Sequence, residues 1–188
     1  MRTFRLAAGF ERLDALEGKL CLPCNNFARI PLVGLYFRVV SRLGDGIAWY
    51  AMLAALPVVF GKPALLPAAH MAMTALAGVL VYKGLKTTLL RERPFASHAN
   101  VEAITAPLDR YSFPSGHTLH ATAFLVMLAH YFPVIALIML PFGLSVAASR
   151  VILGLHYPSD VLFGALIGWV LARTSLLLAG MPWGLSSF

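Results

Sequence analysis

Five long apolar segments limit what this chain can fold into more than any other feature of its sequence. They cover residues 46–60, 64–85, 115–131, 133–149 and 159–179. A transmembrane helix needs about 20 predominantly apolar residues, with a range of about 17–25, so all segments but the first are long enough. The first has Asp45 as a candidate N-cap, and we expect its helix either to tilt little or to extend beyond its apparent ends. The pattern predicts an all-α, polytopic membrane helix bundle with five spans.

The N-terminal region, residues 1–45, differs from the rest because charges interrupt its apolar residues. Its apolar run at residues 30–37 lies between two arginines and is too short to span a bilayer. The region otherwise mixes both signs of charge with apolar residues, which is typical of an amphipathic helix on a membrane surface. We therefore expect a surface region over 1–45 and an embedded bundle over 46–188. A sixth span over residues 27–43 remains open.

Composition and charge agree with a membrane protein and argue against a nucleic-acid-binding one. Of the 188 residues, 59% are hydrophobic and 12% are charged, whereas soluble domains have about 45–50% and about 25%. The net charge is +7, but the basic residues flank the apolar segments instead of lining one polar face. We expect the lipid bilayer as a partner and no nucleic acid, and the oligomeric state is open.

The two cysteines, Cys21 and Cys24, are spaced as CLPC. That spacing occurs in redox pairs and in half zinc sites, but zinc takes four ligands and no nearby His or Cys supplies the others. A redox pair would need the helix N-terminus of a thioredoxin-like unit, which the pattern does not show. The spacing therefore favours two small apolar residues near the membrane surface.

Five spans place three polar segments at the same end of the bundle. The first, KTTLLRERP at residues 86–94, continues the second apolar segment. If it is helical, Lys86 and Arg93 share a face with a rise of roughly 10.5 Å between them, and two cations on one face need either a bound anion or deep water. Pro94 is expected to end this helix, and Arg91, on another face, is expected to contact lipid head groups. Taken alone, the segment equally fits a helix end whose basic side chains reach toward the surface.

The second segment, PSGH at residues 114–117, opens the third apolar run. Ser115 is a candidate N-cap, Gly116 allows a ligand close to the backbone, and the free N–H groups of a helix start bind anions such as phosphate. His117 lies next to that helix start. The segment also fits a capping motif with an incidental histidine. We assign no chemistry to four other histidines and expect packing or loop positions for them: His70, His98, His120 and His130.

The third segment, SRVILGLHYPSD at residues 149–160, ends the fourth apolar run and leads into the fifth. Arg150 lies near its start, and His156 precedes a proline suited to the first turn of a helix. Asp160 follows His156 by four residues. A carboxylate at that spacing can accept a hydrogen bond from one ring nitrogen and leave the other free as a base or nucleophile. The alternative is a His-Asp pair that holds two helices together.

Together the three segments supply two or three cations, a helix N-terminus and two histidines, one of them backed by an aspartate. Cations and aimed N–H groups suit phosphate oxygens. Two histidines suit a two-step cleavage in which one attacks phosphorus and the other protonates the leaving oxygen. Because the sequence shows no cluster of carboxylates that could hold Mg²⁺ or Ca²⁺, we expect no metal and no cofactor.

The same three segments resemble the signature of the type-2 phosphatidic acid phosphatase superfamily, to which vanadium haloperoxidases also belong. That signature is Lys, six residues, Arg-Pro; then Pro-Ser-Gly-His; then Ser-Arg, five residues, His, three residues, Asp. Every position is present, in order, within residues 86–160. The resemblance implies that His156 attacks phosphorus to form a phosphohistidine, that Asp160 orients it, and that His117 protonates the leaving oxygen. It also implies that the phosphate oxygens are held by Lys86, Arg93, Ser115, Gly116 and Arg150.

The resemblance and the apolar bundle predict an integral-membrane, metal-independent phosphatase of lipid phosphates. Membrane members of the family usually have six spans, one more than the five predicted here. A prenyl diphosphate or a glycerophospholipid phosphate is the favoured substrate, lipid A phosphate is also open, and the loop at residues 95–113 is expected to shape the choice. The alternative functions are an anion or lipid-phosphate transporter without hydrolysis and, more weakly, a haloperoxidase.

The basic residues also predict the side of the membrane on which the site opens. With five spans, every Lys and Arg except Lys62 and Arg173 lies toward the end that holds the three segments. The positive-inside rule then places the site on the cytoplasmic face of a bacterial inner membrane. The family resemblance implies the periplasmic or lumenal face more often, so the periplasmic face is the alternative.

Overall fold

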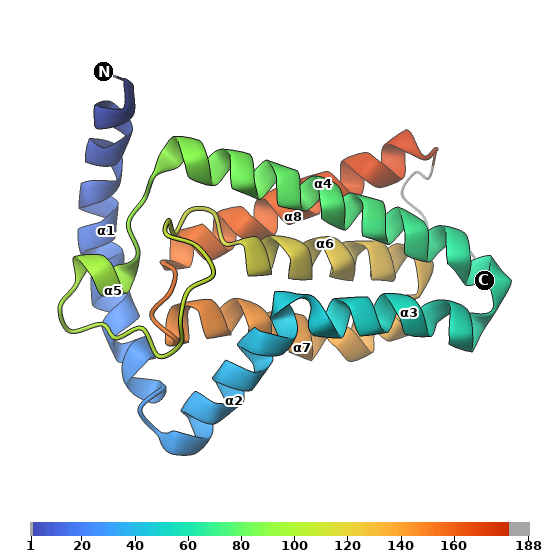
Figure 1. Cartoon of the computed structure of the whole chain (residues 1–188), viewed down its shortest axis with the longest axis horizontal. Helices are drawn as coiled ribbons and strands as arrows, with labels where there is room; N and C mark the ends of the chain where they lie inside the picture. The colour runs from blue at the N-terminus through green and yellow to red at the C-terminus, as the bar shows by residue number, and fades with distance from the viewer. Residues whose placement is uncertain (1, 181–188) are drawn as a thin grey trace.

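Five helices run side by side along the long axis of the molecule, as the sequence predicts (Figure 1). They are α3 (Ala48–Phe60), α4 (Leu65–Leu89), α6 (Gly116–Tyr131), α7 (Pro133–Ile152) and α8 (Pro158–Leu178). The remaining helices are α1 (Arg2–Phe27), α2 (Pro31–Arg42) and the short α5 (Pro94–Ser97). This computed structural model describes the backbone of residues 2–180 and the side chains of residues 12–180, and every regular element in that part of the chain is helical.

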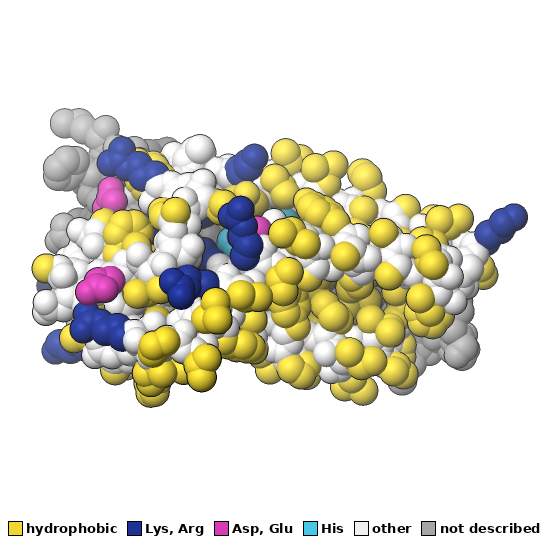
Figure 2. Space-filling view, turned by 60° about the horizontal axis from the view of Figure 1, so that its bottom comes forward, with side chains coloured by type: hydrophobic (Ala, Val, Ile, Leu, Met, Phe, Trp, Pro, Cys, Tyr) yellow, Lys and Arg dark blue, Asp and Glu magenta, His cyan; other side chains and the backbone are white. Residues whose placement is uncertain are grey.

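The helices have the lengths and surfaces of a membrane protein. Four helical stretches are long and apolar enough to cross a membrane: Pro31–Phe60, Lys62–Ser97, Pro133–Ile152 and Pro158–Leu178. α6, with 16 residues, is shorter than a usual span, but it packs against α4, α7 and α8. Large apolar side chains cover the outer faces, whereas most charged side chains gather at one end (Figure 2). The chain is therefore an all-α, polytopic membrane bundle.

α2 is a bent extension of the first span and not a separate sixth one. It leads through a kinked turn, Leu43–Ile47, into α3, and Gly46 with a φ of 140° marks the bend. The first apolar segment is short because its helical stretch extends beyond it toward the N-terminus. This confirms the second of our two expectations for this segment. The expected N-cap role of Asp45 is wrong, since no side chain caps the start of α3 and the Asp45 carboxylate contacts His117 instead.

α1 lies across the end of the bundle that carries most of the charged side chains (Figures 1 and 2); its place on a membrane surface stays a prediction. The Asn25 side chain fixes its C-terminal end. It donates to the carbonyl oxygens of Glu102 and Ile152 at 3.0 and 3.1 Å and accepts the Glu102 N–H at 2.9 Å. Cys21 and Cys24 are free thiols. Burial raises the pKa of Cys21 to about 12, which agrees with a packed apolar residue.

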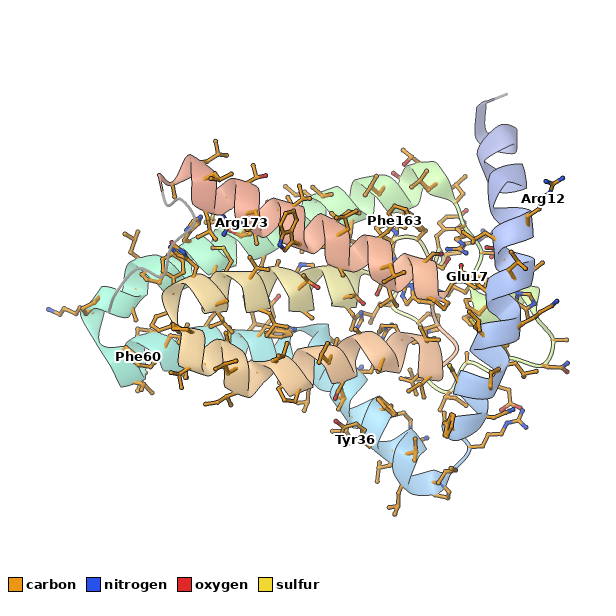
Figure 3. The ribbon with its side chains drawn as sticks, turned by 180° about the vertical axis from the view of Figure 1, so that it is seen from behind. Arg12, Glu17, Tyr36, Phe60, Phe163 and Arg173 are labelled. Carbon is orange, nitrogen blue, oxygen red and sulfur yellow. The ribbon has the colours of Figure 1, made fainter. Side chains whose placement is uncertain are left out.

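Two glycines in the sequence GALIG allow α8 to pack directly against α6, and Figure 3 shows the two helices from behind. A Cβ on Gly168 would lie 2.2 Å from the Leu119 carbonyl oxygen, and one on Gly164 would lie 2.5 Å from the Ser115 carbonyl oxygen. Backbone atoms cannot move aside as a flexible side chain can, so both positions require glycine. This seam brings the starts of the two helices together, where the Ser115 N–H donates to the Asp160 carbonyl oxygen at 3.0 Å.

A polar network joins three helices toward the other end of the bundle. The two ring nitrogens of His70 lie 2.7 Å from the Tyr131 hydroxyl and 2.7 Å from Ser175 Oγ. The Thr74 hydroxyl lies 2.9 Å from the same Ser175 oxygen. Hydrogen bonds of this kind hold membrane helices together, because the lipid offers no other partner. His70 therefore has the helix-interface position that the sequence predicts.

Candidate active site

A cavity of about 400 Å³ opens among α3, α4, α6 and the loops that precede α6 and α8. Polar residues from all three predicted segments line one part: Lys86, Arg93, Gly116, His117, Arg150 and His156. Apolar residues of α3, α4 and α6 line the other part, among them Trp49, Leu53, Leu76, Val79 and Phe124. Figure 2 shows a hollow in which a histidine and an acidic side chain are visible between basic ones. The cavity thus joins a cationic end to an apolar end.

Lys86 and Arg93 reach the cavity from different backbone elements. α4 ends before the left-handed residue Leu90, whose φ is 47°, so the expectation that this helix continues as far as Pro94 is wrong. Pro94 begins α5 instead. The two cations still meet, because Lys86 Nζ and Arg93 Nη2 contact the same oxygen, Oδ1 of Asp109, at 2.5 and 2.7 Å.

Asp109 belongs to the long loop before α6, and no pattern in the sequence marks it as a site residue. The same loop supplies further acceptors. Arg93 Nε donates to the carbonyl oxygens of Asp109 and Arg110 at 3.1 and 3.3 Å, and Lys86 Nζ donates to that of Tyr111 at 3.0 Å. The loop therefore fixes both cations at the cavity wall, where a phosphate would compete with the Asp109 carboxylate for them.

The expectation that Arg91 contacts lipid head groups is wrong. Its side chain is fully buried and lies behind the site. Its guanidinium contacts the carboxylates of Asp14, Glu17 and Asp160 at 2.6, 2.7 and 2.5 Å. Glu17 also accepts the N–H and the hydroxyl of Ser159 at 2.7 and 2.6 Å. The expectation fails because the sequence does not show that α1 brings two carboxylates against this end of the bundle.

His156 lies in the loop between α7 and α8, and its imidazole is buried at the cavity wall. Nδ1 is 3.5 Å from Oδ2 of Asp160, longer than an ordinary hydrogen bond, and Nε2 is 3.3 Å from Nη1 of Arg93. Burial, together with the charges of Arg93, Arg150 and Lys86, lowers the pKa of His156 well below its usual value. The ring is therefore neutral at pH 7, with Nε2 on the side of the cations.

The Asp160 carboxylate is held from two sides, one turn away from His156. Its Oδ2 accepts the Tyr157 N–H at 2.8 Å, and its Oδ1 accepts a hydrogen bond from Arg91 Nη1 at 2.5 Å. Pro158 occupies the first turn of α8, as the sequence predicts. With two fixed hydrogen bonds, the carboxylate has little freedom to turn away from the imidazole.

α6 begins at the site, and Ser115 is its N-cap, as predicted. The Ser115 hydroxyl accepts the Thr118 N–H at 3.5 Å and lies 3.0 Å from the Thr118 hydroxyl. Ser115 is fully buried, and Gly116, the first residue of the helix, lines the cavity. The first turn of α6, whose N–H groups have no acceptor within the helix, therefore borders the cavity.

His117 follows in the first turn of α6, and its Nε2 contacts the Asp45 carboxylate. No sequence pattern links these two residues, which lie 72 positions apart. His120 has the packing position that we expected, although it also reaches the cavity wall. Its Nδ1 lies 2.8 Å from the Gly116 carbonyl oxygen and its Nε2 lies 3.1 Å from that of Ala75, so both ring nitrogens face backbone.

Arg150, in the last turn of α7, is buried and lines the cavity. Its Nη1 donates to the Ser41 hydroxyl at 2.5 Å. None of the ion pairs found among residues 12–180 includes Arg150. Its charge therefore has no fixed carboxylate partner in that part of the chain and can interact with an anion in the cavity.

Six of the eight residues predicted for the site line the cavity, and the other two, Ser115 and Asp160, lie directly behind it. The sequence reasoning missed two carboxylates that also line it, Asp45 and Asp109. Their only signals were a glycine on each side of Asp45 and the length of the loop that carries Asp109. Within the described chain, no three His, Cys, Asp or Glu side chains gather in a way that could hold a metal ion.

This chain is similar to known proteins over more than half of its length. The model of the PAP2 superfamily matches residues 66–182, more than half of the chain. The chain is 35% identical to the decaprenylphosphoryl-5-phosphoribose phosphatase of Mycolicibacterium smegmatis over 133 residues, 68% of each protein. It is 36% identical to a lipid A 1-phosphatase of Rhizobium etli over 87 residues, which are 46% of this chain and only 34% of that protein.

Two solved structures have the same fold. Aquifex aeolicus LpxE superposes with a TM-score of 0.73 and 28% identity, over 85% of this chain and 93% of that one. The transmembrane PAP2 type phosphatidylglycerolphosphate phosphatase of Bacillus subtilis superposes with a TM-score of 0.76 and 21% identity, over 95% and 92%. The three polar segments that meet at the cavity lie inside the matched region, and this chain belongs to the PAP2 superfamily.

Proposed function

We propose that this protein is an integral-membrane phosphatase that removes phosphate from a membrane lipid through a phosphohistidine intermediate. The observation that carries the proposal is the neutral, buried His156, which lies among Lys86, Arg93 and Arg150 with His117 in the same cavity. The relatives named above act on a prenyl-linked phosphate and on a lipid A phosphate, and an undecaprenyl-diphosphatase of Bacillus subtilis is 33% identical over 110 residues. These names support the same class of substrate.

In the first step the phosphate oxygens bind to the three cations and to the first turn of α6. The lone pair of His156 Nε2 attacks phosphorus and forms a P–N bond, while the bond from phosphorus to the lipid oxygen breaks with its electron pair on that oxygen. His117 gives its proton to the oxygen, so the lipid leaves as an alcohol, or as a monophosphate when the substrate is a diphosphate. Asp160 balances the positive charge that develops on the His156 ring.

In the second step a water molecule attacks the phosphorus of the phosphohistidine. His117, now neutral, accepts one proton of that water, and the P–N bond breaks with its electron pair returning to His156 Nε2. Inorganic phosphate leaves, and both histidines regain their starting protonation. In both steps the fixed cations stabilise charge on the phosphate oxygens in a site with little water, where such charges act strongly.

We propose that the reaction needs no metal ion or other cofactor. Lys86, Arg93 and Arg150 supply positive charge at the place where a metal would neutralise a phosphate in other enzymes. The two carboxylates at the cavity already have partners of their own, because Asp109 contacts Lys86 and Arg93 and Asp45 contacts His117.

The apolar half of the cavity supports a lipid as the substrate. Side chains of α3 and α4 line it, and both helices carry exposed apolar residues on their outer faces. A head group at the cationic end would leave its chain against these apolar walls. A prenyl diphosphate or a glycerophospholipid phosphate remains the proposed substrate. Leu108 and Asp109 bring the loop before α6 to the wall of the same cavity.

The direct test offers a panel of lipid phosphates to the purified protein in detergent and measures the released phosphate. We expect release from at least one prenyl diphosphate or glycerophospholipid phosphate and its loss in a His156→Gln variant. A ³²P-labelled phosphate should appear on His156 when the reaction is quenched early. Binding of the lipids without any release would instead support a transporter, and full activity of His156→Gln would refute the mechanism.

We propose that the protein lies in the bacterial inner membrane with its site on the cytoplasmic face, as the basic residues predict. The test is a single cysteine at Asn100, in the loop on the side of the site, after replacement of Cys21 and Cys24. The cysteine should stay unlabelled by an impermeant reagent in intact cells and become labelled after lysis. Labelling in intact cells would place the site in the periplasm.

A further inference from the structure

We infer that Asp45 is a positioning residue for His117: it orients the His117 ring and stabilises the charged form of that ring, so that His117 can donate a proton to the leaving oxygen. The inference rests on the proposed function and deepens it. Asp45 lies outside residues 66–182, which match the family model, and outside the three polar segments. It enters the site only because the helix that carries it is bent.

The bend between α2 and α3 places Asp45 at the cavity. Asp45 lies in the turn Leu43–Ile47, where the chain kinks between α2 and α3. Gly46, directly after it, has a φ of 140°, which residues with a side chain rarely adopt. Gly44, directly before it, packs so closely that a Cβ would lie 3.0 Å from the Val146 side chain. The two glycines therefore fix the direction in which the Asp45 carboxylate points.

The carboxylate contacts Nε2 of His117, which decides what each nitrogen of that ring can do. A proton on Nε2 is held by Asp45, so the nitrogen that can transfer a proton to a substrate is Nδ1. The same logic applies to His156, whose Nδ1 faces Asp160 and whose Nε2 faces the cations. His117 and His156 thus each have one carboxylate neighbour, although only the pair in the third segment is visible in the sequence.

A proton donor at this place needs a nearby anion. His117 is largely buried, and Arg150 is close enough to disfavour a second positive charge. The carboxylate of Asp45 is the one found in contact with the His117 ring among residues 12–180. Arg42 lies 3.8 Å from the other oxygen of Asp45, but its side chain is mostly exposed, so water screens that pair. Asp45 therefore acts directly on His117, which it contacts, and at longer range on Arg150.

The proton balance of the first step then has a definite form. The imidazolium of His117 carries protons on both nitrogens, and the proton on Nδ1 moves to the lipid oxygen as its bond to phosphorus breaks. The ring is left neutral with its remaining proton on Nε2, still directed at Asp45. In the second step Nδ1 takes a proton from water and restores the imidazolium. Asp45 does not exchange a proton in either step.

This role predicts an effect that depends on the leaving group. A lipid alkoxide is a poor leaving group and needs the proton from His117, whereas 4-nitrophenolate leaves readily without one. In an Asp45→Asn variant we expect kcat for the lipid substrate to fall roughly 10- to 100-fold, with KM changed less than about twofold. With 4-nitrophenyl phosphate we expect kcat to fall less than about threefold. Asp45→Glu should recover part of the lost kcat with the lipid.

Asp109→Asn is the matched control, because it removes one negative charge from the same cavity without contact to either histidine. Loss of the Asp109 charge frees Lys86 and Arg93, so we expect a changed KM. The ratio of kcat for the two substrates should stay the same as in wild type. Gly46→Ala, which moves Asp45 without removing its charge, should behave like Asp45→Asn. Melting temperatures within about 2 °C of wild type would show that the variants are folded.

Several outcomes would overturn the inference. Equal losses of kcat with both substrates would indicate a structural role, and unchanged kinetics of Asp45→Asn would indicate no role. A lower KM and a higher kcat would show that Asp45 competes with the substrate for His117. His156→Gln separates these outcomes from failure of the proposed function, since it must abolish release from both substrates whatever Asp45 does.

Discussion

Replacing Gly164 by alanine is expected to damage the site from outside the cavity. The added Cβ would lie 2.5 Å from the Ser115 carbonyl oxygen, whereas ordinary contact begins at 3.4 Å. Neither atom belongs to a flexible side chain. α8 must therefore move away from α6 by roughly 1 Å to relieve the overlap.

That displacement acts on stability and on activity. Overpacking of this kind usually costs about 1–3 kcal/mol of folding free energy. Asp160 lies in the first turn of α8, His156 lies just before that helix, and His117 lies at the start of α6, so the same shift changes the spacing of the two histidines. A misplacement of about 1 Å can lower the rate about 100-fold. Gly164→Ala should thus lose more activity than its stability alone explains.

The assay compares kcat for phosphate release with the melting temperature in detergent. Gly168→Ala, one turn further from the site, should lower the melting temperature as strongly, because its Cβ would lie 2.2 Å from the Leu119 carbonyl oxygen, but should retain more activity. Gly84→Ala is the control, since nothing lies within 4 Å of its Cβ. A Gly164→Ala variant as stable and active as wild type would show that the contact between α6 and α8 does not require glycine at this position.

Three further predictions concern the helix across the bundle end and the chemistry of the site. Arg91→Met should destabilise the protein by about 3–5 kcal/mol, because it leaves the buried carboxylate of Asp160 without its cation, and thermal unfolding measures this; a melting temperature like that of wild type would contradict it. At pH 8 roughly one Cys21 in 10,000 carries a thiolate, since its pKa is raised to about 12. Iodoacetamide should therefore modify Cys24 and spare Cys21 in the folded protein, as mass spectrometry can show. Excess EDTA should leave phosphate release unchanged, and loss of activity that Mg²⁺ restores would disprove metal independence.

Much of the bundle could be predicted because hydropathy and helix length report directly on membrane spans. The five predicted segments correspond to α3, α4, α6, α7 and α8, with ends that differ by a few residues. The bend at Gly46 could not be predicted, since the charges of the N-terminal region hide the helical continuity of α2 and α3. The end of α4 was misjudged for a similar reason, because Leu90 adopts a left-handed backbone that its residue type does not favour.

Local spacing identified the parts of the site that lie within one segment, such as Ser115 with Gly116 and His156 with Asp160. Local spacing did not identify the partners that come from elsewhere in the chain. Arg91 looked like a surface anchor because two of its three carboxylate partners lie in α1, about 75 residues away. Asp45 and Asp109 looked unrelated to the histidines and cations that they contact. Single residues at long sequence separation carry no periodicity, so only the fold can pair them.

The position of α1 has a consequence for how the protein can be handled. Asp14 and Glu17 lie near the beginning of the chain, yet one arginine separates them from the carboxylate behind His156. A deletion of the first 20 residues would leave the family match and every span intact. It would also strip the Arg91 guanidinium of two of its three carboxylates and free the backbone at Ser159. A shortened protein would therefore insert as a membrane bundle with its reaction centre loosened, and a fusion partner at the N-terminus needs a linker that lets α1 stay in place.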